Sequence, residues 1–308
     1  MLRVFILALA LTLPSHASAF DLSGTITILE GSAVVYRGTG RVHAVGGLRL
    51  TGGDIIETAA STFMQIELVD RSVVQLGPAT RMMITAPGSR QKSERSLYVL
   101  DGWVKMDGSK RDAAAGPGFE MRTPLIELPA NSGVAVMRHS PSELSLFVER
   151  GDVRVGERQA NGSVVAVNLK VNDFYVRKPG ARGAVAGGAT KAFIAEMPRD
   201  FRDSLPPMLE KFADRLVQPP EAPEFAYADV ERWLKAESAV RRSVMPRWRW
   251  KVREPAFRSA LVANLSAHPE WDPILFPEKY LPKPPPVPRA AVAVSKASSS
   301  SAAASAVN

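Results

Sequence analysis

The segment from Arg247 to Lys251 reads Arg-Trp-Arg-Trp-Lys, so cations alternate with indole rings. Indole faces attract cations, and guanidinium groups donate paired hydrogen bonds to carboxylates and phosphates. On a strand, the two indoles would share one face and the cations the other. One interpretation is a contact strip for sugars or an anionic polymer, made of Arg247, Trp248, Arg249, Trp250 and Lys251.

A second interpretation places these indoles in a protein core. Four of the five tryptophans fall in the C-terminal third of the chain, where other large apolar residues are few: Trp233, Trp248, Trp250 and Trp271. Tryptophan is highly buried on average, and arginine or lysine can pack its stem while its charge stays in water. We favour this second interpretation.

The other residues that could support chemistry do not form a recognisable site. His43, His139 and His268 stand alone, without the spacing of a metal-binding motif. Gly183–Gly188 has the glycine spacing of a phosphate loop but lacks the lysine that must follow directly. We therefore predict a protein that is not an enzyme, with no catalytic residue, metal or cofactor. A hydrolase with an unrecognised site remains the alternative.

The first residues decide where the protein acts. Arg3 precedes an apolar run from Val4 to Leu13, and the small residues Ala17 and Ala19 follow. This is the layout of a cleaved signal peptide. The run is too short for a membrane span, which needs about 18 apolar residues or more. We expect export to the periplasm or beyond it, cleavage between Ala19 and Phe20, and no transmembrane segment in the mature chain.

The composition narrows the choice of partner. The chain has no cysteine, so disulfides and thiolate metal sites are excluded. Its net charge is +8, and removal of Arg3 with the signal would leave +7. Export makes nucleic acid an improbable target for this charge, which leaves a protein or an anionic cell-envelope polymer as the expected partner.

Most of the chain before residue 180 has the pattern of short strands. Met64, Ile66 and Leu68 alternate with polar residues, as in a half-buried strand, and glycine-containing turns separate such runs. We predict a mainly β roll, sandwich or short solenoid. Two similar segments, "LDGWVKM" and "ERGDVRV", suggest that Gly102 and Gly151 lie where the chain turns a corner.

The composition changes after residue 180. Apolar residues then recur at helical spacing, as in Phe257, Leu261 and Leu265, and Pro255 suits the first turn of a helix. The last residues are rich in proline, serine and alanine, which is typical of disorder. The predicted organisation is a signal peptide at 1–19, a leading β segment at 20–49, a central domain at 50–156, a closing β segment at 157–180, a linker at 181–190, a small helical subdomain at 191–280 and a disordered tail at 281–308.

The central domain carries a series of motifs in a fixed order. They are Gly53-Asp54, Thr58, Asp70, Ser72, Leu76-Gly77-Pro78, Gly102, Thr123-Pro124 and Gly151-Asp152-Val153. In order and spacing, residues 50–156 resemble the FecR domain, the periplasmic module of iron-dicitrate-type sensor regulators. The resemblance implies a β-rich scaffold that binds rather than catalyses.

The sequence departs from this family pattern in two places. Arg71 stands where the family has glycine, which predicts a different turn there. Asn131-Ser132-Gly133 replaces the usual Gly-Thr. In addition, the family's regulators have an anti-sigma segment and a membrane helix ahead of the domain, where this sequence has the predicted signal peptide. The resemblance therefore does not imply signalling to a sigma factor.

Together these observations predict an exported FecR-domain protein that serves as a binding or scaffold module for a protein or cell-envelope ligand. A peptidoglycan- or polysaccharide-binding protein that uses the Arg247–Lys251 strip is the first alternative, and the hydrolase is the second.

The exported protein should begin at Phe20, because Ala17 and Ala19 supply the small side chains that signal peptidase requires. Intact mass spectrometry of the protein from the periplasmic fraction measures this directly. Recovery of a chain that retains Met1 in a membrane fraction would contradict the predicted cleavage.

Overall fold

The computed structural model describes residues 22–85, 95–130, 133–203 and 205–281. The predicted signal peptide, with Ala19 and Phe20, lies outside these residues, as does the predicted tail apart from Leu281. Within the described residues, no helix is long and apolar enough to cross a membrane.

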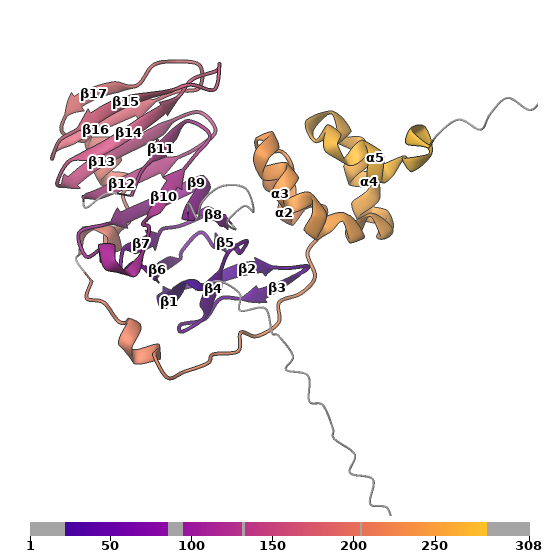
Figure 1. The fold of residues 1–308 in the computed structure, drawn as a ribbon, viewed down its shortest axis with the longest axis horizontal. Coiled ribbons are helices and arrows are strands. Elements are labelled where there is room, and N and C mark those ends of the chain that lie inside the picture. The colour runs from indigo at the N-terminus through magenta and orange to yellow at the C-terminus, as the bar shows by residue number, and fades with distance from the viewer. Residues whose placement is uncertain (1–21, 86–94, 131–132, 204, 282–308) are drawn as a thin grey trace, which may run out of the picture.

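The chain is mainly β, and its described strands form one open sheet that is bent into a roll with two facing layers (Figure 1). Neighbouring strands are antiparallel except β9 and β10. Face A runs in the order β4 (Arg49–Thr51), β1 (Leu22–Glu30), β6 (Phe63–Leu68), β7 (Val73–Leu76), β9 (Arg95–Asp107), β12 (Val134–His139), β13 (Leu144–Arg150), β16 (Asp173–Arg177) and β17 (Ala184–Gly187). Face B runs in the order β3 (Gly40–His43), β2 (Ala33–Arg37), β5 (Ile55–Thr58), β8 (Arg81–Thr85), β9, β10 (Phe119–Arg122), β11 (Ile126–Leu128), β14 (Val153–Arg158) and β15 (Val164–Leu169). This confirms the predicted fold class.

Strand β9 belongs to both faces. Its first half pairs with β8 and β10 on face B, and its second half pairs with β7 and β12 on face A. Gly102 lies between the halves with a φ of 109°, which L side chains rarely adopt. Gly151, between β13 and β14, has a φ of 69°. Both glycines therefore lie at turns of the chain, as their shared sequence context predicted.

The main core lies between the two faces. It is built from the inward side chains of both layers, including Ile26, Ile66, Val99 and Leu146, all of which have no exposed surface. Contacts of this kind between two layers are the usual way in which a sheet buries its apolar face.

A segment after the last strand covers the outside of face A. This strap, residues 189–203 and 205–212, contains α1 (Lys191–Glu196) and two 3-10 turns, η2 (Arg199–Arg202) and η3 (Leu209–Phe212). Its side chains Phe193, Met197 and Phe201 pack on outward-facing Phe63, Trp103, Val136 and Phe174. Every residue of β6 is therefore buried, and the prediction of a half-buried strand is wrong because the strap covers its polar side as well.

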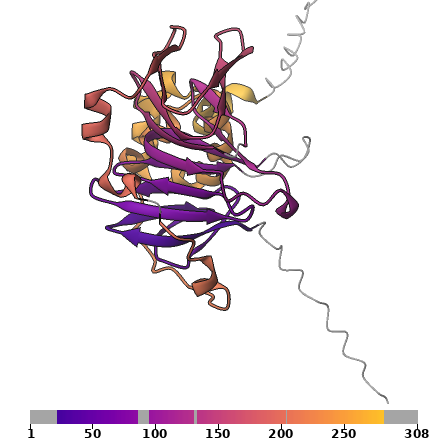
Figure 2. The same cartoon turned by 90° about the vertical axis from the view of Figure 1, so that its left-hand side faces the viewer.

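Four helices and intervening turns cover the outside of face B, and Figure 2 shows them behind the roll. Their apolar side chains form one cluster with Tyr36, Ile55, Met83, Tyr98 and Leu100 of the sheet. Pro255 begins a helix, as predicted. The elements are α2 (Tyr227–Leu234), α3 (Ser238–Trp248), η4 (Arg249–Arg253), α4 (Pro255–Ala263), η5 (Leu265–Ala267), η6 (Pro269–Trp271), α5 (Asp272–Leu275) and η7 (Pro277–Tyr280), while η1 (Ala113–Ala115) belongs to the roll.

The residues predicted as a linker, 181–190, contain strand β17. Its small side chains gave no apolar alternation, so the sequence did not reveal it. Backbone pairing with β16, from Ala184 with Val176 to Gly187 with Asp173, forms the strand instead. The roll therefore extends to Gly187, and the helical part of the chain begins with the strap.

Replacement of Gly102 by alanine should lower the free energy of unfolding by roughly 3 kcal/mol or more, because backbone strain and a clash add together. A Cβ at Gly102 would come 2.4 Å from the Thr80 backbone Cα. Gly38→Ala is the matched control, since Gly38 also has a positive φ but no atom near its Cβ position. Denaturant unfolding compares the two variants, and equal losses would contradict the role assigned to the corner.

Candidate functional site

The predicted strip lies in helical structure and not on a strand. Helix α3 ends at Trp248, and η4 continues from Arg249 to Arg253. Val240, Val244 and Trp248 recur every four residues and are all buried, which is the spacing of one helix face. The strand geometry, with both indoles on one face, is therefore wrong for this segment.

Trp248 lies inside the cluster that joins the helices to face B. Its indole is fully buried, and its ring centroid lies 5.6 Å from that of Phe225 and 6.1 Å from that of Tyr36. Tilted and edge-to-face aromatic contacts at these distances stabilise a core beyond the area they bury. Trp248 is thus placed as the favoured interpretation expected, in a core and not on a binding surface.

Arg247 ties α3 to the roll. Its guanidinium donates to the carbonyl oxygens of Tyr36 (3.1 Å), Gly38 (3.3 Å) and Gly53. Burial lowers the pKa of this side chain, while Asp54 acts in the opposite direction. All three carbonyls come from the N-terminal strands and turns, so this arginine holds the helices in place and is not a free cation.

Lys251 is also engaged within the protein. Its side chain is 1% exposed, and its Nζ lies 2.6 Å from Glu254 and 3.2 Å from Glu224. The same nitrogen lies 4.7 Å from the ring centroids of Phe225 and Trp250. A buried ammonium is tolerated only when it is paired in this way, so its charge is already neutralised.

The part of the strip that remains available is a pocket of about 410 Å³ between β3 and η4. Half-buried Trp250 lines it together with Arg41, Glu224, Phe225 and Lys251. Exposed Arg249 does not line it. The five predicted residues therefore do not form one continuous surface, although the pocket retains an aromatic and charged lining.

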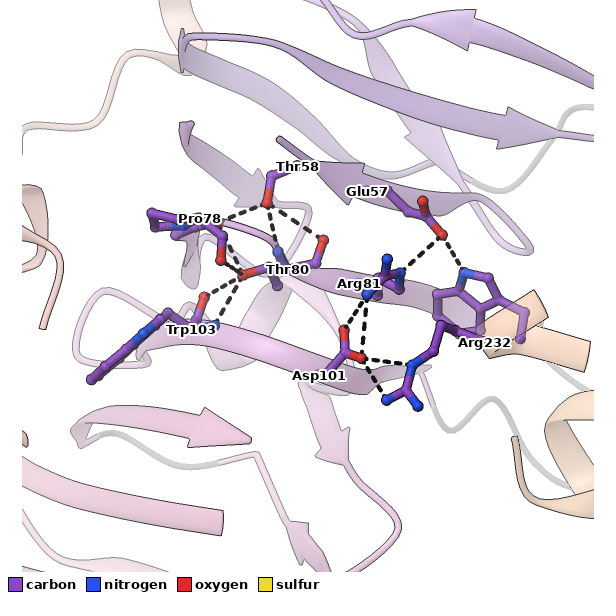
Figure 3. A network of polar contacts seen from close by, with 10 residues as sticks. Glu57, Thr58, Pro78, Thr80, Arg81, Asp101, Trp103 and Arg232 are labelled. Atoms are coloured by element: carbon purple, nitrogen blue, oxygen red, sulfur yellow. Dashed lines mark hydrogen bonds and ion pairs between the residues drawn. The ribbon is translucent and has the colours of Figure 1, made fainter. Parts of the chain in front are cut away.

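A polar network links the roll to α2, and Figure 3 shows it from close by. Glu57 on β5 accepts a hydrogen bond from the Trp233 indole (2.6 Å) and lies 3.5 Å from Arg81. Asp101 on β9 lies 3.1 Å from Arg81 and accepts hydrogen bonds from Arg232 at 2.8 and 3.2 Å. Two carboxylates and two guanidiniums alternate in this network, so their charges cancel. Their ion pairs hold α2 against face B.

Burial raises the pKa of Glu57, and the hydrogen bond from Trp233 and the charge of Arg81 act against this increase. The sequence did not predict this network, because Glu57 and Trp233 are 176 residues apart and Asp101 and Arg232 are 131 apart. No local spacing connects residues at such distances in the chain.

The family motif residues support turns and corners. The Thr58 hydroxyl donates to Gly77 (2.7 Å) and accepts from the Thr80 amide (2.8 Å), while the Thr80 hydroxyl accepts from the Trp103 amide (3.0 Å) (Figure 3). Other motif carboxylates cap local turns, as Asp70 does by accepting from the Ser72 amide and hydroxyl. These contacts show that the motif side chains stabilise turns of the roll.

Arg71 corrects one expectation. It has a φ of 66°, which is the left-handed conformation that a glycine favours at such a turn. The arginine therefore adopts the conformation expected of the family's glycine, so the departure in sequence does not require a different backbone there.

The described residues contain no group of three or more histidine, aspartate or glutamate side chains that could hold a metal ion. His139 and His268 are buried in separate places, on β12 and beside α2, and His43 is exposed on β3. The structure brings none of the predicted isolated histidines together.

The described residues form an open two-layered roll with motif residues at its corners and a helical cover. In a comparison with known families, residues 54–154, 101 of the 308, match the family described as FecR protein. This part of the chain is a FecR domain. The roll itself is longer than the match and includes β1 to β4 before it and β15 to β17 after it.

Two crystal structures of a putative anti-sigma factor from Parabacteroides distasonis ATCC 8503 are similar to this chain, at 17% and 18% sequence identity and a TM-score of 0.37 each. The similarity covers 46% of this chain and 63% and 62% of theirs, so less than two thirds of those proteins is matched. No curated protein matches the chain.

Trp248→Ala should lower the free energy of unfolding by about 3–5 kcal/mol, the usual loss on emptying a large aromatic site. Arg247→Gln should cost about 1.5–3 kcal/mol, because charged hydrogen bonds to three backbone carbonyls, two of them part-buried, are lost. Arg249→Gln is the matched control and should change stability by about 0.5 kcal/mol or less. Chemical denaturation followed by tryptophan fluorescence measures all three. Equal effects of the two arginine variants would contradict the separate roles that the structure gives them.

Acid should destabilise the fold from about pH 6.5 downward, the ordinary histidine pKa in an unfolded chain. Burial lowers the pKa of His139, so the unfolded chain takes up a proton that the folded chain does not. Its contribution is therefore full above pH 6.5 and is lost as the pH falls toward the lowered value. His139→Gln should flatten this part of the stability curve, whereas His43→Gln, at an exposed position, should leave it unchanged. Unfolding free energies at pH 5 to 8 test this, and identical curves for the two variants would refute it.

Proposed function

We propose that this chain is an exported FecR-domain protein that acts in the periplasm as a non-enzymatic binding or scaffold module for another protein. The observation that carries the proposal is the use of the motif residues. Thr58, Asp70 and Gly102 hold turns and corners of the roll, and the charged residues at its helical interface neutralise one another. The motif residues thus stabilise the roll, whose ordered surface is what a partner protein would contact.

The FecR match over residues 54–154 supports a regulatory or sensory setting, in which such modules act by contact with other proteins. The roll is suited to this because its core, strap and helices fix one another. A protein partner would meet a surface that is already ordered, so little entropy would be lost on binding.

Cross-linking in cells that export the tagged protein tests the proposal. We expect one protein to be cross-linked repeatedly, and the purified pair to form a complex of defined stoichiometry in analytical ultracentrifugation. Retention by purified cell wall alone, or turnover of a glycan or ester substrate, would overturn it. Recovery of the chain from the cytoplasm would overturn the periplasmic setting.

A polysaccharide or peptidoglycan ligand is the second candidate, and one observation favours it. The pocket beside β3 brings together the ring of Trp250, the ring of Phe225 and the cation of Arg41. Ring faces of this kind, beside hydrogen-bonding side chains, suit a sugar ring. Trp250→Ala should then reduce retention on purified cell wall, with Arg249→Gln as the control outside the pocket. Unchanged retention of the Trp250→Ala protein would exclude this candidate.

A further inference from the structure

The two ends of the roll (Figure 1) differ in whether another segment of the chain covers the outer strand. At one end, the outer strand β3 is covered: His43 donates to the Pro220 carbonyl (2.9 Å), and Ala222 donates to the Arg41 carbonyl (3.1 Å). Val42 also pairs with Glu221 as an isolated bridge. At the other end, β15 pairs only with β14, and β17 pairs only with β16, within the described part of the chain. This second end, the open end, presents two unpaired strand edges.

The open end also exposes the end of the core. Val165 is paired with Glu157, and Val185 with core residue Tyr175, so both valines occupy inward-facing positions. They are nevertheless 50% exposed each. Val164 and Val171 beside them are exposed to a similar degree. A stack of strands normally ends in a capping segment whose outer side is polar. The open end of this roll instead exposes valine side chains.

Edge strands that have no binding role usually carry a charge, a proline or a bulge that prevents other chains from pairing with them. Strand β15, Val-Val-Ala-Val-Asn-Leu, contains neither a charge nor a proline. Its register with β14 runs without a shift from Val164 to Leu169. It is therefore a regular six-residue edge with backbone groups on its free side.

The charge of the open end indicates what can occupy it. The two segments that border it, residues 159–170 and 178–191, contain no aspartate or glutamate. They carry four cations, and all are exposed: Lys170, Lys178, Arg182 and Lys191. Among the nearby carboxylates, that of Glu157 is buried against Arg177 (2.9 Å), and that of Asp173 accepts from the Lys170 amide (2.7 Å). The carboxylate of Glu143 lies 3.8 Å from Lys178 and offsets part of its charge, so the positive charge of the open end rests mainly on the other three cations.

This charge favours one occupant over two others. A second copy would bring the same four cations against its partner. The chain's own residues 282–308 contain Lys283, Arg289 and Lys296 and no carboxylate, so they would meet the same repulsion. An acidic segment of another protein would meet complementary charge.

We propose that an extended segment of a partner protein, with alternating apolar and acidic side chains, pairs with the free edge of β15 as an added strand. Its backbone continues face B, its apolar side chains cover Val165 and Val185, and its carboxylates meet the exposed cations. This inference rests on the proposed function, because it names where the protein partner binds.

Fluorescein-labelled peptides of alternating valine and glutamate serve as the probe, with fluorescence anisotropy as the readout and the full chain as the receptor. We expect saturable binding. Two peptide controls should bind about tenfold more weakly or worse: a valine–lysine peptide, because of charge, and the valine–glutamate peptide N-methylated at every residue, because neither edge of its backbone can then donate to β15.

Two variants locate the site. Val165→Glu should weaken binding of the glutamate peptide about tenfold or more and improve binding of the lysine peptide. Val262→Glu is the matched control, since Val262 is 42% exposed on α4, far from the open end, and it should bind as the unaltered chain does. If Val165→Glu does not fold, Lys170→Glu combined with Arg182→Glu alters only exposed side chains and should show the same reversal of preference.

Other outcomes would overturn the inference. Equal binding of both peptides would do so, as would a dimer in analytical ultracentrifugation that Val165→Glu dissociates. Deletion of residues 282–308 that strengthens peptide binding about tenfold would assign the edge to the chain's own tail. A partner found by cross-linking that binds the Lys170→Glu, Arg182→Glu protein unchanged would refute this inference while the proposed function stands.

Discussion

The constraint on which the structure depends is that both outer faces of the roll carry large apolar side chains. Phe63, Trp103 and Phe174 project from face A, and Tyr36 and Tyr98 project from face B. A sheet layer of this kind exposes too much apolar surface to remain uncovered in water. The strap buries the apolar side chains of face A, and the helices bury those of face B. The strap and the helices, within residues 189–203 and 205–281, are therefore an integral part of the fold and not an appended module.

Alternation of residue types and turn signals was sufficient to predict the mainly β fold, and the resemblance of the ordered motifs to a known family located the FecR domain. It was not sufficient for the cover. The polar residues of β6 suggested that one side of this strand is exposed to solvent. Gln65 instead hydrogen-bonds within the sheet, and Glu67 accepts from the amides of Met208 and Leu209. Apolar and polar residues alternate in the same way in a strand that is buried on both sides, as β6 is, and in a strand that is exposed on one side. Only the distant strap distinguishes them.

The candidate site shows the same limit. The alternation of cations and indoles from Arg247 to Lys251 looked like a strand, whereas the burial of Val240, Val244 and Trp248 sets a helical period. The residue types indicated the burial of Trp248, but the expectation that the cations keep their charges in water is wrong for two of the three, which are held by carbonyls or carboxylates. Their geometry depended on Tyr36, Gly53 and Glu224, which no local window includes. Sequence reasoning thus identified residues that matter without identifying what they contact.

The long separation between the roll and its cover has a consequence for folding. Arg247 meets the carbonyl of Tyr36 across 211 residues, and Trp233 meets Glu57 across 176. Contacts so distant in the chain form slowly, because a large loop must close before they contribute. Until the C-terminal helices arrive, face B presents aromatic side chains to any other unfolded chain, which is the condition under which large β proteins aggregate. The protein is therefore most prone to aggregation between completion of the roll and docking of the helices. A chaperone that protects it in this interval would bind face B.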